Sequence, residues 1–63
     1  MKNKYEPGDL IEVDDRILLI LKVEELKSTK IYQFEQIYPN QKYSTADKFY
    51  EGSYYHQGAV IIK

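Results

Sequence analysis

The sequence contains no cysteine and no tryptophan, and it has only one histidine, two prolines and three glycines in 63 residues. Without cysteine, no disulfide can brace the chain and no thiolate can bind a metal, which excludes zinc-ribbon and redox proteins. His56 and the scattered carboxylates lack the close spacing of a zinc site, so we expect no metal and no other cofactor. The glycines are isolated, and none belongs to a glycine-rich phosphate-binding loop.

Long apolar runs are also missing. The longest run has five residues, from Ile17 to Leu21, whereas a membrane helix needs roughly 20. The N-terminal segment 1–7 has basic residues but no apolar stretch, so it does not resemble a signal peptide. We expect a soluble cytoplasmic protein with a single domain over residues 1–63. At this length the core is shallow, and stability is marginal or depends on a partner.

Charge is unevenly distributed, although the net charge is only -1. Residues 6–25 hold seven acidic and two basic residues, a local balance of -5. The rest of the chain holds seven basic and three acidic residues, a balance of +4. The acidic part should therefore repel phosphate, and the remainder should tolerate it mildly.

The first half of the chain has the pattern of a β-hairpin. Pro7 and Gly8 indicate a turn, and residues 9–13 then alternate, with Ile11 and Val13 on one face. Asp14 and Asp15 follow at the spacing of a two-residue hairpin loop. We therefore predict a short strand, a tight turn and a second strand.

The second strand, over residues 16–26, is the most apolar part of the chain. One face of the strand carries Ile17, Leu19, Leu21 and Val23. The other face is apolar only in the first half of the strand, so the strand begins with apolar side chains on both faces and ends with only one apolar face. A helix is the alternative, but β-branched residues and the flanking turns favour a strand. The two-sided burial indicates a strongly bent sheet, or a dimer that covers the second face.

Three further elements are predicted after a polar turn at 27–30. Residues 31–38 form a third strand, which Pro39 ends. Residues 45–51 form one or two helical turns, with Ser44 as the N-cap and Gly52 as the stop signal. Residues 59–62 form a short terminal strand whose apolar side chains suggest burial. The predicted fold class is all-β and mainly antiparallel, a small SH3-like, partly open barrel of four or five strands.

Aromatic residues are the one compositional excess, and eight of the nine lie in the second half of the sequence. We expect Tyr32, Phe34 and Phe49 to lie in the core, which is too small to bury the others. Exposed tyrosine is enriched at protein interfaces. The sequence therefore predicts a surface that binds a larger protein partner, formed by Tyr38, Tyr43, Tyr50, Tyr54, Tyr55 and His56.

Nucleic-acid binding is the alternative function. Lys42 and Lys48 lie near these tyrosines in sequence, and tyrosine rings can stack on bases. The sequence pI of about 5.7 disfavours it, because nucleic-acid-binding modules are usually basic. Self-association as a homodimer is a further alternative.

Catalytic patterns are nearly absent. A Ser53–His56 pair would be a very local nucleophile and base. Glu24 and Glu25 are adjacent on a strand, so their side chains point to opposite faces and cannot converge on one site. We therefore expect a binding protein and not an enzyme.

One stretch resembles a known family. The residues from Tyr5 to Val13, which read Tyr-Glu-Pro-Gly-Asp-Leu-Ile-Glu-Val, resemble the opening of small SH3-like barrels. The small size and the wealth of Lys, Tyr and Ile resemble accessory proteins of phages and prophages of low-GC Gram-positive bacteria. The resemblance covers about residues 5–38. The chain lacks the SH3 peptide-binding signature and the glycine-centred loop of ribosomal KOW modules, so the resemblance implies neither the ligand of SH3 domains nor that of KOW modules. It implies a non-enzymatic protein that inhibits, redirects or recruits a larger host or phage protein in the host cytoplasm.

Overall fold

The computed structural model describes residues 3–39 and 47–63. In these ranges all paired strands are antiparallel and form one sheet of five strands with the order β4-β3-β2-β1-β5. The elements are β1 (Leu10–Val13), β2 (Arg16–Glu25), β3 (Lys30–Tyr38), β4 (Asp47–Tyr50), α1 (Tyr54–Gly58) and β5 (Val60–Ile61). The prediction of a small, mainly antiparallel all-β domain is confirmed.

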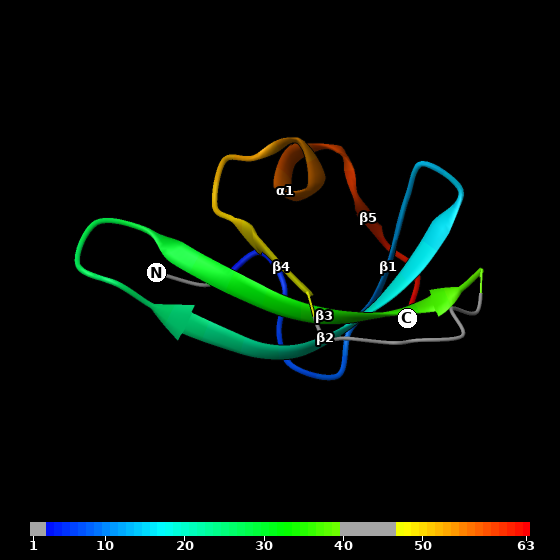
Figure 1. Ribbon diagram of the computed structural model, residues 1–63, viewed down its shortest axis with the longest axis horizontal. Coiled ribbons are helices and arrows are strands. Elements are labelled where there is room, and N and C mark those ends of the chain that lie inside the picture. The colour runs from blue at the N-terminus through cyan, green and yellow to red at the C-terminus, as the bar shows by residue number, and fades with distance from the viewer. Residues whose placement is uncertain (1–2, 40–46) are drawn as a thin grey trace.

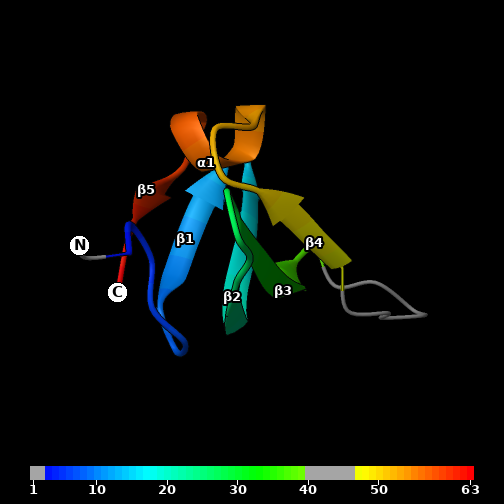
Figure 2. The same cartoon turned by 90° about the vertical axis from the view of Figure 1, so that its left-hand side faces the viewer.

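The sheet is bent but not closed into a barrel. β2 and β3 form a long arched hairpin, and α1 lies over the concave side of the arch (Figure 1). In the perpendicular view, β5 and β4 form the two edges of the sheet and α1 lies above the space between them (Figure 2). We call the face toward α1 the inner face and the opposite one the outer face.

The two predicted turns of the N-terminal half are confirmed. Gly8 has φ +96°, and the Asp9 amide donates to the Glu6 carbonyl oxygen at 3.0 Å. Asp14 and Asp15 both have positive φ, 52° and 61°, and they join β1 to β2. Two consecutive left-handed residues match the right-handed twist of a two-residue hairpin, and aspartate tolerates this conformation better than most residues.

The faces of β2 differ from the predicted alternation because the β2–β3 pairing is irregular. Leu18 and Ile20 lie on the inner face and are buried. A register shift between Ile20 and Lys22 then inserts one extra residue, and Val23 packs against the core. A bulge of this kind breaks the period of two, which is why Val23 does not follow the parity of Leu21.

The core is rich in aromatic side chains. Tyr32 is fully buried, and Phe34 and Phe49 are each 6% exposed, as predicted. Tyr5 is also fully buried, although it belongs to the polar segment 1–7, where no core residue was predicted. The core cluster consists of Tyr5, Ile11, Val13, Leu18, Ile20, Tyr32, Phe34, Phe49 and Ala59.

The predicted helix at 45–51 is wrong over its described part, because Asp47–Tyr50 is the strand β4. Phe49 pairs with Tyr32 and is buried. Pairing with β3 and burial of alternate side chains therefore decide the structure of this segment, and the helix signals do not. Gly52, at φ +84°, belongs to the turn after the strand. Ser44 and residues 45–46 lie outside the described residues. The helix comes later, at Tyr54–Gly58.

The C-terminal strand is present but not buried. Ala59 is buried, whereas Val60 and Ile61 are exposed. β5 lies at an edge of the sheet and pairs with β1 alone in the residues described. The predicted burial of this strand is therefore wrong for residues 60–62, because β5 lies at the edge of the sheet, and it is right for Ala59 alone.

Two buried tyrosines offer a test of this core. The Tyr5 hydroxyl donates to the carbonyl oxygens of His56 at 2.7 Å and Ala59 at 3.3 Å, whereas the Tyr32 hydroxyl has no hydrogen-bond partner among the described residues. Tyr5→Phe should lower the free energy of unfolding by about 1–2 kcal/mol, and Tyr32→Phe should change it by less than about 0.5 kcal/mol or raise it. Urea denaturation measures both, and the reverse order of the two effects would contradict the structure.

Candidate functional site

A tight turn and a side-chain cap position α1. The Ser53 amide donates to the Tyr50 carbonyl oxygen at 3.0 Å, which closes the turn through Gly52. Ser53 is then the N-cap, and its hydroxyl accepts from the His56 amide at 3.3 Å. Serine is a favoured N-cap because its oxygen satisfies an amide that has no partner within the helix. The chain thereby brings three of the predicted site residues together in one helical turn, Tyr54, Tyr55 and His56.

Both tyrosines of α1 bind the distant β1–β2 turn. The Tyr54 hydroxyl donates to Asp14 Oδ1 at 2.7 Å, and the Arg16 guanidinium donates to the Tyr55 hydroxyl at 2.6 Å. The hydrogen bond to Asp14 and the charge of that carboxylate raise the pKa of Tyr54. Tyr54 stays 65% exposed, whereas Tyr55 is half-buried and packs against the core. Tyr54 is therefore an exposed ring with a fixed position.

His56 supports the fold and does not reach into the solvent as a binding group. Its carbonyl oxygen accepts from Lys4 Nζ at 2.7 Å and from the Tyr5 hydroxyl at 2.7 Å. Its Nδ1 accepts from the Gly52 amide at 3.0 Å, and its ring lies 5.5 Å from that of Tyr32, centre to centre. The contact between Ser53 and His56 uses the histidine main chain, so the side chains are not arranged as a nucleophile and base.

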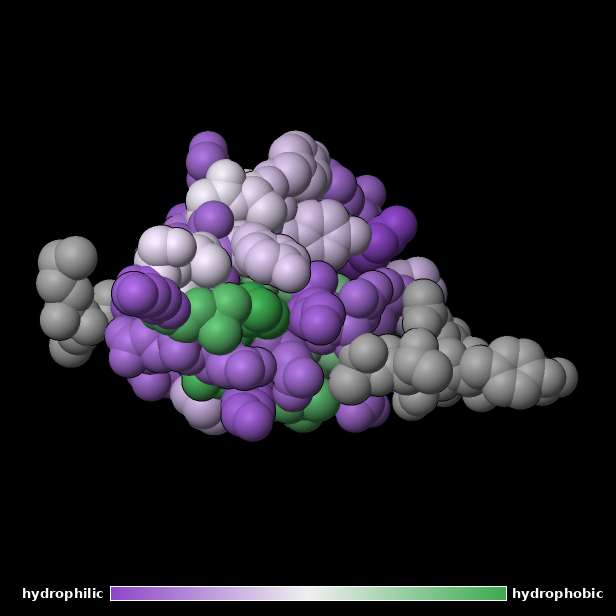
Figure 3. Space-filling model, turned by 60° about the vertical axis from the view of Figure 1, so that its left-hand side comes forward, coloured by the Kyte–Doolittle hydropathy of each residue, from purple (hydrophilic) through white to green (hydrophobic). Residues whose placement is uncertain are grey.

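A shallow pocket lies between α1 and β4. Its volume is about 250 Å³. We call it the tyrosine pocket, and its lining residues are Phe34, Asp47, Lys48, Phe49, Ser53, Tyr54 and Tyr55. In the space-filling view, residues of intermediate hydropathy gather over the upper part of the molecule, where α1 lies, above an apolar patch with a hydrophilic border (Figure 3).

A second depression, of about 280 Å³, lies at the β2–β3 turn. It is lined by residues 25–30 and Glu51, all of which are charged or polar except Leu26. It contains no aromatic residue. The tyrosine pocket is the stronger candidate, because aromatic side chains in a concave site supply most of the contact energy of a binding surface.

The remaining predicted site residues are dispersed. Tyr38 and Tyr50 are exposed, and they pair with Ile17 and Ile31 on the outer face, toward opposite ends of β3. Lys48 pairs with Gln33, so its side chain also belongs to the outer face. Lys42 and Tyr43 lie outside the described residues. The predicted surface is therefore divided between the two faces of the sheet.

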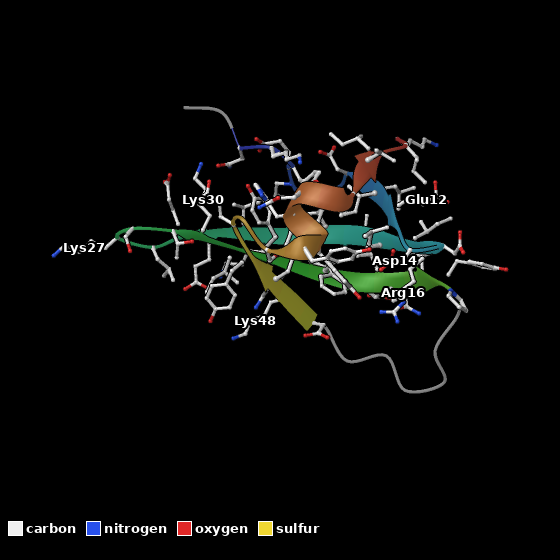
Figure 4. All side chains as sticks on the ribbon, turned by 90° about the horizontal axis from the view of Figure 1, so that it is seen from above. Glu12, Asp14, Arg16, Lys27, Lys30 and Lys48 are labelled. Atoms are coloured by element: carbon white, nitrogen blue, oxygen red, sulfur yellow. The ribbon has the colours of Figure 1, made fainter. Side chains whose placement is uncertain are left out.

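Charged groups of both signs lie at each end of the molecule, and Glu25 and Glu51 line the depression at the β2–β3 turn together with Lys27 and Lys30. Lys27 and Lys30 lie at the end formed by the β2–β3 turn, whereas Glu12, Asp14 and Arg16 lie at the other end, near α1 (Figure 4). Over residues 3–39 and 47–63, no group of three or more His, Cys, Asp or Glu side chains is arranged to hold a metal ion.

Comparisons with protein-family models, with curated proteins and with solved structures find no match to this chain. Within the described part of the chain, no helix has the length and apolar character needed to span a membrane.

The position of His56 predicts how stability depends on pH. Burial lowers the pKa of His56 below its ordinary value of 6.5, Lys4 and Lys30 act in the same direction, and Glu51 opposes them. Below about pH 6.5 the unfolded chain therefore binds a proton that the folded chain does not, so the free energy of unfolding should fall as the pH drops through the folded pKa.

The measurement is urea denaturation at steps between pH 7.5 and 5. His56→Asn is the matched control, because its side-chain oxygen can accept from the Gly52 amide but does not titrate. The slope of stability against pH should be smaller in this variant. Equal slopes in the two proteins would show that His56 does not carry the effect.

Proposed function

We propose that this protein is a small non-enzymatic binding protein that contacts a larger protein through the surface of α1. The observation that supports it most strongly is the exposure and the position of Tyr54. The residue is 65% exposed, its hydroxyl donates to Asp14, and it lines the tyrosine pocket. A rigid aromatic side chain beside a concave site is the usual form of an interface hot spot, because little conformational freedom is lost on binding.

The class of partner follows from the sequence resemblance. Small SH3-like accessory proteins of phages and prophages bind larger host or phage proteins and inhibit, redirect or recruit them. We propose a role of this class, in the cytoplasm of the host cell.

A nucleic-acid accessory function is the second candidate, and one observation favours it. Lys48 is one of the residues that line the same pocket as Tyr54 and Tyr55, although its pairing with Gln33 places its side chain on the outer face. Phosphate binding normally uses several cations, however, and the pocket also contains Asp47. A mobility-shift assay with single- and double-stranded DNA at low salt tests this candidate, which requires binding that weakens as salt is added.

Substitution of Tyr54 tests the leading proposal. Tyr54→Ala should lower capture of the partner from a lysate of the source organism by at least about tenfold, since hot-spot truncations cost about 2 kcal/mol or more. The structure is retained because Tyr54 is exposed, and circular dichroism checks this. Capture is quantified by mass spectrometry of the bound protein.

The control is Leu26→Ala, which removes a side chain of the β2–β3 turn that is 41% exposed. This change should leave capture intact. At the neighbouring position, phenylalanine is a safer replacement for Tyr55 than alanine. Tyr55 packs on the rings of Phe34 and Phe49 with centre distances of 6.0 Å, so removal of its ring would disturb the core. Equal capture by wild type and Tyr54→Ala would sink the proposal that α1 is the contact surface.

A further inference from the structure

We infer that the tyrosine pocket binds a positively charged side chain, an arginine or a lysine, of the partner protein. This inference rests on the proposed function and specifies the chemistry of its site. Four features carry it: the arrangement of aromatic rings, the position of Asp47, the charges of the adjacent turn and the fixed position of the tyrosines.

Four aromatic residues line the pocket. Phe34 and Phe49 lie 5.6 Å apart, centre to centre, and are nearly buried. Tyr55 lies 6.0 Å from each of them, and Tyr54 lies 6.1 Å from Tyr55. The faces of aromatic rings carry negative potential, so a pocket walled by them attracts a cation as well as an apolar group.

Asp47 supplies a negative charge on the same face of the sheet. It pairs with Phe34 in the β3–β4 register, whereas Lys48 pairs with Gln33 and so directs its side chain to the outer face. Asp47 Oδ1 accepts from the Lys48 amide at 2.8 Å, which fixes the carboxylate at the pocket. The carboxylate of Asp47 therefore lies on the same face of the sheet as the aromatic rings, and the side chain of Lys48 lies on the opposite face.

The turn behind the tyrosines strengthens this preference. Asp14 and Asp15 form the turn, and Asp14 binds the hydroxyl of Tyr54. Asp14 and Asp47 are thus two carboxylates at the pocket, and Arg16 and Lys48 are the two cations beside it. Because the guanidinium of Arg16 is bound to the Tyr55 hydroxyl and the side chain of Lys48 belongs to the outer face, the carboxylates favour a basic partner over a phosphate backbone.

The pocket is also organised before binding. Hydrogen bonds from Tyr54 to Asp14 and from Arg16 to Tyr55 hold both rings against the β1–β2 turn. Little side-chain freedom is then lost when a ligand binds, which leaves more of the contact energy for affinity.

Titration by NMR with small probes tests the inference. The probes are N-acetyl-arginine amide and its neutral isostere N-acetyl-citrulline amide, each added up to 50 mM to protein labelled in its backbone and aromatic rings. Arginine amide should shift the signals of Phe49, Tyr54 and Tyr55 and should bind at least about threefold more tightly than citrulline amide. Equal binding of the two probes, shifts confined to the β2–β3 turn, or no shift with either probe would overturn the inference.

Variants then assign the effect to the pocket. Tyr54→Leu keeps the apolar volume and removes the aromatic face, and it should weaken binding of arginine amide by about two- to fivefold. Asp47→Asn should reduce the difference in affinity between arginine amide and citrulline amide. Tyr50→Leu is the matched control on the outer face and should change nothing, whereas an equal loss in this control would contradict the assignment.

Failure of the inference and failure of the proposed function give different results. If the protein captures a partner through Tyr54 but does not prefer arginine amide over citrulline amide, the inference is wrong and the proposed function stands. If no partner is captured at all, the proposed function fails, whatever the small probes do. Shifts of Tyr54 and Tyr55 with a ten-residue oligothymidine, and not with arginine amide, would overturn the inference in favour of nucleic acid.

Discussion

Burial of Tyr5 is the contact on which the rest of the structure depends. Its ring meets those of Tyr32, Phe49 and His56 edge-on, with centre distances of 5.5, 6.1 and 5.8 Å. Its hydroxyl binds the end of α1 through the carbonyl oxygens of His56 and Ala59. A helix of five residues cannot persist by itself in water, so its position depends on contacts of this kind. One side chain thus joins the N-terminal arm, the sheet and the helix.

The candidate site depends on the same contacts from its other side. The core holds α1 through Tyr5 and Tyr55, and the β1–β2 turn holds it through Asp14 and Arg16. An open sheet of five strands with one covered face has little apolar area to bury, so each of these contacts is a large share of its stability. The fold and the candidate site therefore share their supporting interactions, which explains how so short a chain can hold exposed aromatic rings in place.

Local patterns in the sequence predicted much of this fold. The two N-terminal turns, the strands β1, β2 and β3 and the aromatic core at Tyr32, Phe34 and Phe49 follow from turn residues and from alternation. Tyr5 was missed because an isolated aromatic residue in a polar arm carries no periodic signal. Bulges in the β2–β3 pairing were missed for the same reason, since one extra residue reverses the faces that follow it.

The candidate site was predicted in part. The excess of tyrosine pointed to residues 54–56, and the structure does bring these together. The sequence gives no signal for the hydrogen bond between Asp14 and Tyr54, which are 40 positions apart. It also treats Tyr38, Tyr50 and Tyr54 as one surface, although the sheet separates the first two from α1.

The most direct test of the account is photocrosslinking from the surface of α1 in living cells. A photoreactive phenylalanine derivative replaces Tyr54 in one variant and Leu26 in another, and the covalent products are identified by mass spectrometry. We expect one dominant product with a larger protein from position 54 and none from position 26. Crosslinks from position 26 alone, or crosslinks from position 54 to nucleic acid only, would contradict it.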